Sequence, residues 1–80
     1  MPDFSKIESE LIFLGLSIAE HRRKAGLTQK ELADACGISR EHLAAIESAK
    51  IKRPFSVETL LKICSVLEIE PKDVFEGKMC

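Results

Sequence analysis

The sequence predicts an all-α fold, a compact domain of five helices. Ala, Leu, Ile, Glu and Lys dominate the composition, whereas Trp and Tyr are absent and β-branched residues are scattered. Apolar residues recur at the spacing of three and four that an amphipathic helix requires. Eighty residues suffice for one core. No repeat, low-complexity tract or long linker divides the chain, so residues 1–80 are expected to form a single domain.

The first helix is expected to end near Ala25 and Gly26, with Ser5 or Ser9 capping its start. Its apolar stripe steps by three and four and consists of Phe4, Ile7, Leu11, Leu14 and Ile18. Three more apolar residues lie off this stripe: Ile12, Phe13 and Leu16. The second face should therefore be covered, either by the C-terminal helices or by a partner subunit.

Residues 28–48 are predicted to form two short helices joined by a tight turn, a helix-turn-helix. Thr28 and Glu31 have the spacing of a capping box, which starts the first of these helices. Gly37 supplies the positive φ that ends it, and Ser39 caps the second. The residues expected to face the core are Leu32, Ala35, Cys36, Leu43 and Ile46, with Ile38 at the corner and the small Ala33 where the two helices meet.

Two further helices are expected after a loop at residues 49–55, in which Pro54 stops helical structure. Ser56 should cap a helix that runs to about Leu67. Its predicted buried side consists of Leu60, Leu61, Ile63, Cys64 and Leu67. Pro71 should open a last short helix that is anchored by Val74 and Phe75 and ends at Gly77.

The charge is segregated along the chain. The formal net charge is −1, yet residues 20–53 hold eight basic residues against five acidic ones. The field that attracts phosphates is local, so the helix-turn-helix can be attractive to DNA despite the acidic total.

Several classes of protein are disfavoured. The cysteines Cys36, Cys64 and Cys80 lack zinc-site spacing, and we expect the first two to be small core residues, with no metal or cofactor bound. No catalytic constellation occurs, so the chain is not expected to be an enzyme. The apolar run at residues 11–19 is too short to span a membrane, and no signal peptide is visible, which predicts a soluble cytoplasmic protein.

The stretch from Leu14 to Phe75 resembles the Cro/C1-type (XRE) helix-turn-helix family, which includes lambdoid phage repressors. The resemblance rests on the RKAGLTQKELA block, the GIS turn, Glu47, the KIKRP loop and the VETLLKICSVLEIEP segment. It implies a five-helix lambda-repressor-like domain whose second and third helices form the motif. Such proteins are usually homodimers on palindromic double-stranded DNA, with residues 39–48 in the major groove here. Residues 1–13 would extend the first helix.

The resemblance also assigns roles to residues. Arg22 and Glu47 are expected to form a structural ion pair between the first and third helices. Arg40 can read guanine and Glu41 cytosine, while Ala44 and Ala45 present methyl groups to the groove. The residues expected to bind DNA phosphates are Thr28, Gln29, Ser39, Lys50, Lys52 and Arg53.

The leading hypothesis is a small sequence-specific transcriptional regulator, a repressor or a restriction-modification-type controller. With no room for a ligand domain, no small-molecule ligand is expected, and control would come from concentration, dimerisation or a partner. The alternative is a protein-interaction module, such as an antitoxin half or an adaptor, that docks through the apolar first helix.

Overall fold

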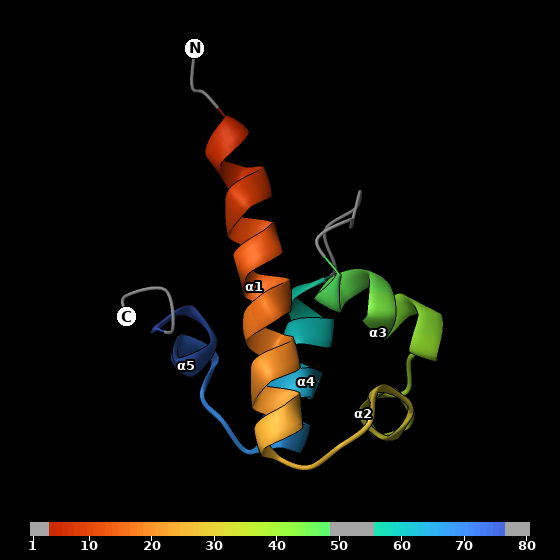
Figure 1. Cartoon of the computed structure of the whole chain (residues 1–80). Coiled ribbons are helices and arrows are strands. Elements are labelled where there is room, and N and C mark those ends of the chain that lie inside the picture. Colours follow the sequence, from red (N-terminus) through yellow and green to blue (C-terminus); the bar gives the residue numbers. More distant parts are fainter. Residues whose placement is uncertain (1–3, 49–55, 77–80) are drawn as a thin grey trace.

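The chain forms five α-helices in a computed structural model that describes residues 4–48 and 56–76 (Figure 1). All regular secondary structure in these ranges is helical, which confirms the predicted all-α class. The predictions for Lys50, Lys52, Arg53, Pro54 and Gly77 lie outside the described residues. The helices are α1 (Ser5–Lys24), α2 (Gln29–Cys36), α3 (Arg40–Glu47), α4 (Val57–Leu67) and α5 (Pro71–Glu76).

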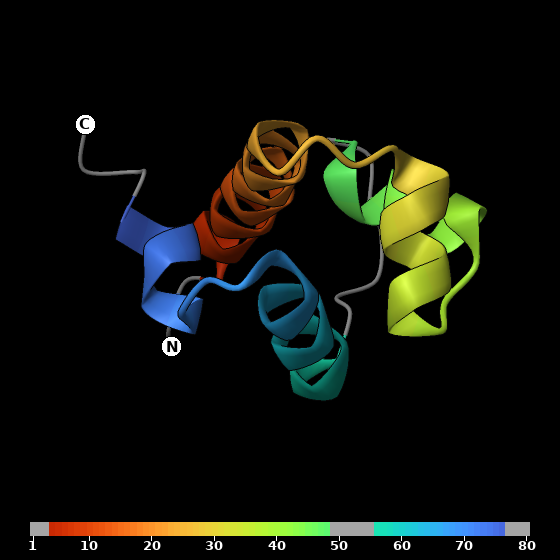
Figure 2. The ribbon, with the colours of Figure 1, turned by 90° about the horizontal axis from the view of Figure 1, so that it is seen from below.

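The long helix α1 organises the molecule, because it packs against α3, α4 and α5. Helix α2 packs against α3 and α4 instead. In the view from below, α5 lies on one side of α1, and the α2–α3 pair lies on the other (Figure 2). The first turns of α1 project beyond the other helices (Figure 1). The motif is therefore held at one side of a small helical body.

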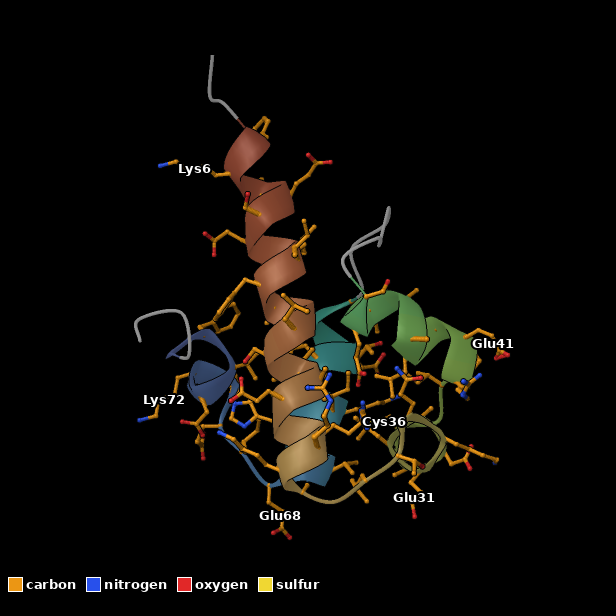
Figure 3. The ribbon with its side chains drawn as sticks, in the orientation of Figure 1. Lys6, Glu31, Cys36, Glu41, Glu68 and Lys72 are labelled. Carbon is orange, nitrogen blue, oxygen red and sulfur yellow. The ribbon has the colours of Figure 1, made fainter. Side chains whose placement is uncertain are left out.

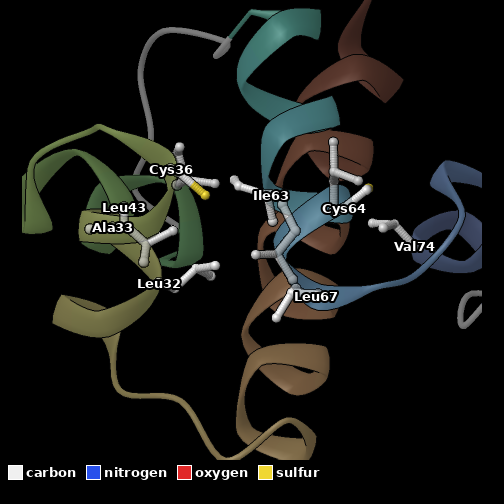
Figure 4. Packing of buried hydrophobic residues seen from close by; sticks show 11 residues of the cluster. Leu32, Ala33, Cys36, Leu43, Ile63, Cys64, Leu67 and Val74 are labelled. Atoms are coloured by element: carbon white, nitrogen blue, oxygen red, sulfur yellow. The ribbon is translucent and has the colours of Figure 1, made fainter.

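A single apolar core joins all five helices, and α4 supplies its centre (Figure 4). Burying the side chain of a Val, Leu or Ile stabilises the fold by about 1.5–3 kcal/mol. The buried residues of this core therefore supply most of the driving force for folding. The cluster consists of Leu14, Ile18, Leu32, Ala33, Cys36, Leu43, Ile46, Ile63, Cys64, Leu67 and Val74.

Three of the predicted helix caps are confirmed by hydrogen bonds. The backbone N–H groups of Glu31, His42 and Thr59 donate to the hydroxyl oxygens of Thr28, Ser39 and Ser56 at 3.1, 2.9 and 3.1 Å. The predicted cap of α1 is wrong: this helix begins at Ser5 with Phe4 in the N-cap position and no side-chain cap. The serine at position 9 therefore lies inside the helix.

Three residues predicted to be buried are not. Ala35 is exposed, whereas Ala33, predicted to lie where the two helices of the motif meet, is fully buried as expected. The face of α2 that packs against α3 and α4 consists of Leu32, Ala33 and Cys36. Leu61 on α4 and Phe75 on α5 are each 49% exposed. On α4 and α5, fewer residues are buried than the apolar pattern of the sequence predicts.

The stripe on α1 is buried only where other helices reach it. Leu14 and Ile18 are in the core, whereas Phe4 and Ile7 are 66% and 49% exposed on the projecting turns. Helix α5 packs against α1 and covers part of its second face. One contact between them is a hydrogen bond from the Ser17 hydroxyl to the Val74 carbonyl oxygen, at 2.7 Å. Leu16 on that face remains 53% exposed, and two others are half-buried, Ile12 and Phe13.

Candidate nucleic-acid interface

The turn between α2 and α3 has the backbone that the sequence predicts. Gly37 adopts a left-handed conformation with φ 73° and ψ 29°. The Ile38 N–H then donates to the Ala33 carbonyl oxygen at 3.0 Å, so the chain leaves α2 sharply. The half-buried Ile38 side chain packs against the core, and Ser39 starts α3 at once. The two helices of the motif are thus held in a defined relation.

The start of α3 is the part of the motif most open to a ligand. Leu43 and Ile46 anchor the inner face of α3 in the core, while Arg40, Glu41 and Ala45 are exposed. Glu41 lies at the outer end of the helix and points away from the body (Figure 3). A guanidinium and a carboxylate on adjacent residues thus stand free, where each can meet a base edge. The fourth candidate base contact, Ala44, is half-buried.

An ion pair ties α1 to the end of α3. The Arg22 Nε donates to Glu47 Oε2 at 2.7 Å, and its NH2 donates to Glu47 Oε1 at 3.1 Å. The side chains are only 11% and 5% exposed, so the pair is largely removed from water. Arg22 NH1 also donates to the Leu27 carbonyl oxygen at 2.7 Å. Arg22 therefore links α1 to both the end of α3 and the segment that leads into α2.

Gln29 joins this network, which the sequence did not reveal. Its Nε2 donates to Glu47 Oε1 at 3.0 Å, although the two residues are 18 positions apart. Gln29 is the first residue of α2 and is half-buried. No spacing rule connects residues on two different helices at this distance in sequence, so only the tertiary structure reveals the contact.

Two other predicted phosphate ligands, Thr28 and Ser39, are exposed at the starts of α2 and α3. Each hydroxyl oxygen accepts a capping hydrogen bond, and each hydroxyl can still donate its own hydrogen. The lysine that follows on α2, Lys30, is exposed and pairs with Asp34 at 2.9 Å. The start of α2 therefore brings Thr28 and Gln29 together, while the loop residues at 50, 52 and 53 lie outside the described ranges.

Cys36 and Cys64 are free, buried thiols, as predicted. Burial raises the pKa of both thiols above the ordinary value, and the carboxylates of Asp73 and Glu70 raise that of Cys64 further. Both are therefore neutral core residues at neutral pH.

Among the described helices, none combines the length and apolar character needed to cross a membrane.

Known proteins share both the sequence pattern and the fold. Residues 18–74 match the sequence model of a family described as helix-turn-helix. A segment of 33 residues, 41% of this chain, is 46% identical to an uncharacterized HTH-type transcriptional regulator of Methanothermobacter thermautotrophicus. The chain spans 48% of that curated relative's length, about half of it.

Two crystal structures resemble the fold closely. One is the restriction-modification controller protein C.AhdI from Aeromonas hydrophila, with a TM-score of 0.77 and 31% identity over 84% of this chain and 98% of that one. The other is the clp gene regulator ClgR from Corynebacterium glutamicum, with a TM-score of 0.77 and 30% identity over 85% of this chain and 73% of that one.

Proposed function

Because the chain belongs to the helix-turn-helix family, in its Cro/C1-type (XRE) group, we propose that it is a transcriptional regulator that binds double-stranded DNA. The observation that carries this proposal is the exposed start of α3, held on a tight turn with Arg40 and Glu41 facing away from the core. The solved relatives are a controller protein and a gene regulator. The family is one of DNA-binding regulators rather than enzymes.

We propose that residues 39–48 enter the major groove and read a short base sequence. The Arg40 guanidinium can donate to guanine O6 and N7, a pairing worth about 1–3 kcal/mol against a wrong base. Glu41 can accept from cytosine N4, which disfavours guanine at the same position because guanine presents only acceptors, O6 and N7, in the major groove. Ala45 offers a methyl group for thymine, and the half-buried Ala44 offers less surface. The proposed site therefore contains guanine and cytosine near the start of α3.

The proposed phosphate contacts surround this helix. Thr28, Gln29 and Ser39 present neutral donors at the starts of α2 and α3, where the helix dipoles favour an anion. The sequence places three cations after α3, the proposed recognition helix: Lys50, Lys52 and Arg53. Such contacts set the affinity and register on DNA without reading its sequence.

We further propose a cytoplasmic homodimer on a palindromic operator, since a two-fold protein matches two half-sites about one helical turn apart. Phe75 and Leu61, each 49% exposed on α5 and α4, are candidate residues of the dimer surface. Val74 does not contribute to that surface, because it is fully buried, as the sequence predicts for an anchor of α5. Light scattering of the purified protein, with Phe75→Ser for comparison, tests the dimer.

The test of DNA binding is selection of a site from random duplexes, followed by titration of the selected site at several salt concentrations. Contacts by Lys and Arg release counterions, so the logarithm of the affinity should fall linearly with the logarithm of the salt concentration. A scrambled duplex of equal length gives the non-specific affinity. If the folded protein binds neither duplex at low salt, the regulator proposal is wrong.

A protein-interaction role, such as an antitoxin half or an adaptor, is the second candidate. One observation favours it: Phe4 and Ile7 are 66% and 49% exposed on turns of α1 that precede the family match at residue 18. Replacing both with serine should abolish partner capture and leave DNA affinity unchanged if the two roles are separate. A loss of DNA affinity with unchanged folding would count against such a separation.

A further inference from the structure

Gln29 is the only side-chain carboxamide in this protein, because the chain has one glutamine and no asparagine. The carboxylate of Glu47 is its hydrogen-bond partner, with Nε2 of Gln29 3.0 Å from Oε1. The same carboxylate accepts two hydrogen bonds from Arg22. Glu47, at the end of the recognition helix, is thus the common acceptor for a guanidinium from α1 and an amide from α2.

The hydrogen bond to Glu47 fixes the orientation of the Gln29 carboxamide. A carboxamide is planar and carries two N–H donors on one nitrogen, directed about 120° apart. When one donor is held by Glu47, the direction of the other is set as well. In the described part of the chain that second donor makes no hydrogen bond, and Gln29 is half-buried rather than enclosed. One amide hydrogen of Gln29 is therefore oriented and still available.

The carboxylate of Glu47 does not prevent an anion from receiving that hydrogen. Glu47 alone would repel a phosphate, but Arg22 cancels its charge at 2.7 Å. Both side chains of the pair are nearly buried, so they hold one geometry instead of sampling several. Gln29 thus gains a firm anchor from the ion pair without the field of an unpaired carboxylate.

We propose that Glu47 is a positioning residue for DNA binding: it takes one amide hydrogen of Gln29 and so directs the other to a phosphate oxygen of the DNA backbone. This inference rests on the proposed function, because it assigns to Glu47 a role in the same interface. Glu47 does not touch DNA in this arrangement. It couples the α1–α3 ion pair to a phosphate contact at the start of α2.

The free protein provides a first test that needs no variant. As the only carboxamide, Gln29 gives the single side-chain NH₂ signal pair in a ¹⁵N–¹H correlation spectrum. We expect one of its two hydrogens to be shifted downfield and to exchange slowly with water, because it is bound to a carboxylate. Gln29→Met should remove the pair, which verifies the assignment. Two hydrogens at the positions of free glutamine, with equal exchange, would overturn the inference.

The second test is a cycle of DNA affinities for Glu47→Gln, Gln29→Ala and the double variant. The loss of an oriented hydrogen bond should weaken the binding of the selected site by about tenfold in either single variant. In the Gln29→Ala background, Glu47→Gln should weaken the binding of the selected site by less than about a further twofold, because the effect of Glu47 passes through Gln29. A purely structural Glu47 would give additive losses instead. Glu58→Gln on α4, exposed and distant in sequence from this network, controls for the change in net charge.

The two tests separate the possible failures. If the wild-type protein binds no DNA, the proposed function fails and this inference fails with it. If it binds DNA while the NH₂ pair of Gln29 does not shift on titration, only the positioning role fails. Should Glu47→Gln not fold, the spectrum of the wild-type protein with and without the selected duplex still decides the outcome. A downfield hydrogen in the free protein and a shift of its partner on binding DNA would support the role.

Discussion

Gly15 of α1 lies directly against the backbone of Ile46 in α3. A Cβ atom built at position 15 would overlap the Ile46 carbonyl oxygen and crowd the carbonyl carbon, and both are backbone atoms that a rotamer change cannot move. The position is buried inside α1. The recognition helix is thus set on α1 by a close approach that only glycine permits.

Gly15→Ala should destabilise the protein, although alanine is the better helix former. The intrinsic gain is about 1 kcal/mol. Pushing α3 away from α1 should cost about 3 kcal/mol, the upper end for overpacking, because the atoms in the way belong to the backbone. Urea unfolding followed by circular dichroism measures the difference. Ser9→Ala, an exposed substitution on the same helix, is the control and should change little. A Gly15→Ala protein as stable as the wild type would contradict the close contact.

Arg22→Met should be strongly destabilising, because it leaves the carboxylate of Glu47 unpaired at a site where that side chain is 5% exposed. Breaking one partner of a buried pair costs about 3–5 kcal/mol. The matched control is Lys24→Met on the same helix, whose pair with Glu20 is 68% and 64% exposed. An exposed pair contributes about 0–1 kcal/mol. Equal losses for the two variants in chemical denaturation would argue against the burial of the Arg22 pair.

Arg40→Ala should relax base preference at one position of each half-site. The lost guanine contact is worth about 1–3 kcal/mol against other bases. Lys52→Ala should instead weaken all duplexes alike and reduce the salt slope by about one unit, because its proposed contact is to a phosphate. Affinities for single-base variants of the selected site distinguish the two. Uniform weakening by Arg40→Ala would remove Arg40 from the base-reading set.

Stability should fall at alkaline pH because of the core thiols. Burial raises the pKa of Cys36 and Cys64 in the folded protein, so the folded state binds more protons than the unfolded state once pH exceeds the ordinary thiol pKa. The stability that the two protonated thiols contribute is fully present below about pH 8.5 and is lost as pH rises. The slope of unfolding free energy against pH should be shallower in a Cys36→Ala/Cys64→Ala variant. Identical slopes would contradict the prediction.

Glu68→Gly should be more stable than Glu68→Ala. Glu68 ends α4 in the left-handed region, with φ 58° and ψ 41°, where any residue with a Cβ is strained. Alanine keeps that strain, whereas glycine relieves it. The glycine variant should therefore have a free energy of unfolding about 1 kcal/mol higher than the alanine variant, reduced in part by the greater freedom of glycine in the unfolded chain. The alanine variant isolates the effect of removing the carboxylate. Thermal unfolding that ranks alanine above glycine would refute the argument.

Local sequence patterns are enough to predict the helices and most of their ends. The caps at Thr28, Ser39 and Ser56 and the turn at Gly37 depend on hydrogen bonds and φ angles within four residues, so local chemistry is enough to predict them. The resemblance to a known family also predicts the Arg22–Glu47 pair, which the structure contains.

The packing of the helices against one another, by contrast, sets which apolar residues are buried and which polar groups meet. Leu61 and Phe75 continue the apolar pattern of their helices, yet each remains 49% exposed. Gln29 reaches Glu47 because α2 and α3 pack side by side. The exposure of a side chain and its long-range partners depend on how neighbouring helices are placed, and the spacing within one helix does not carry that information.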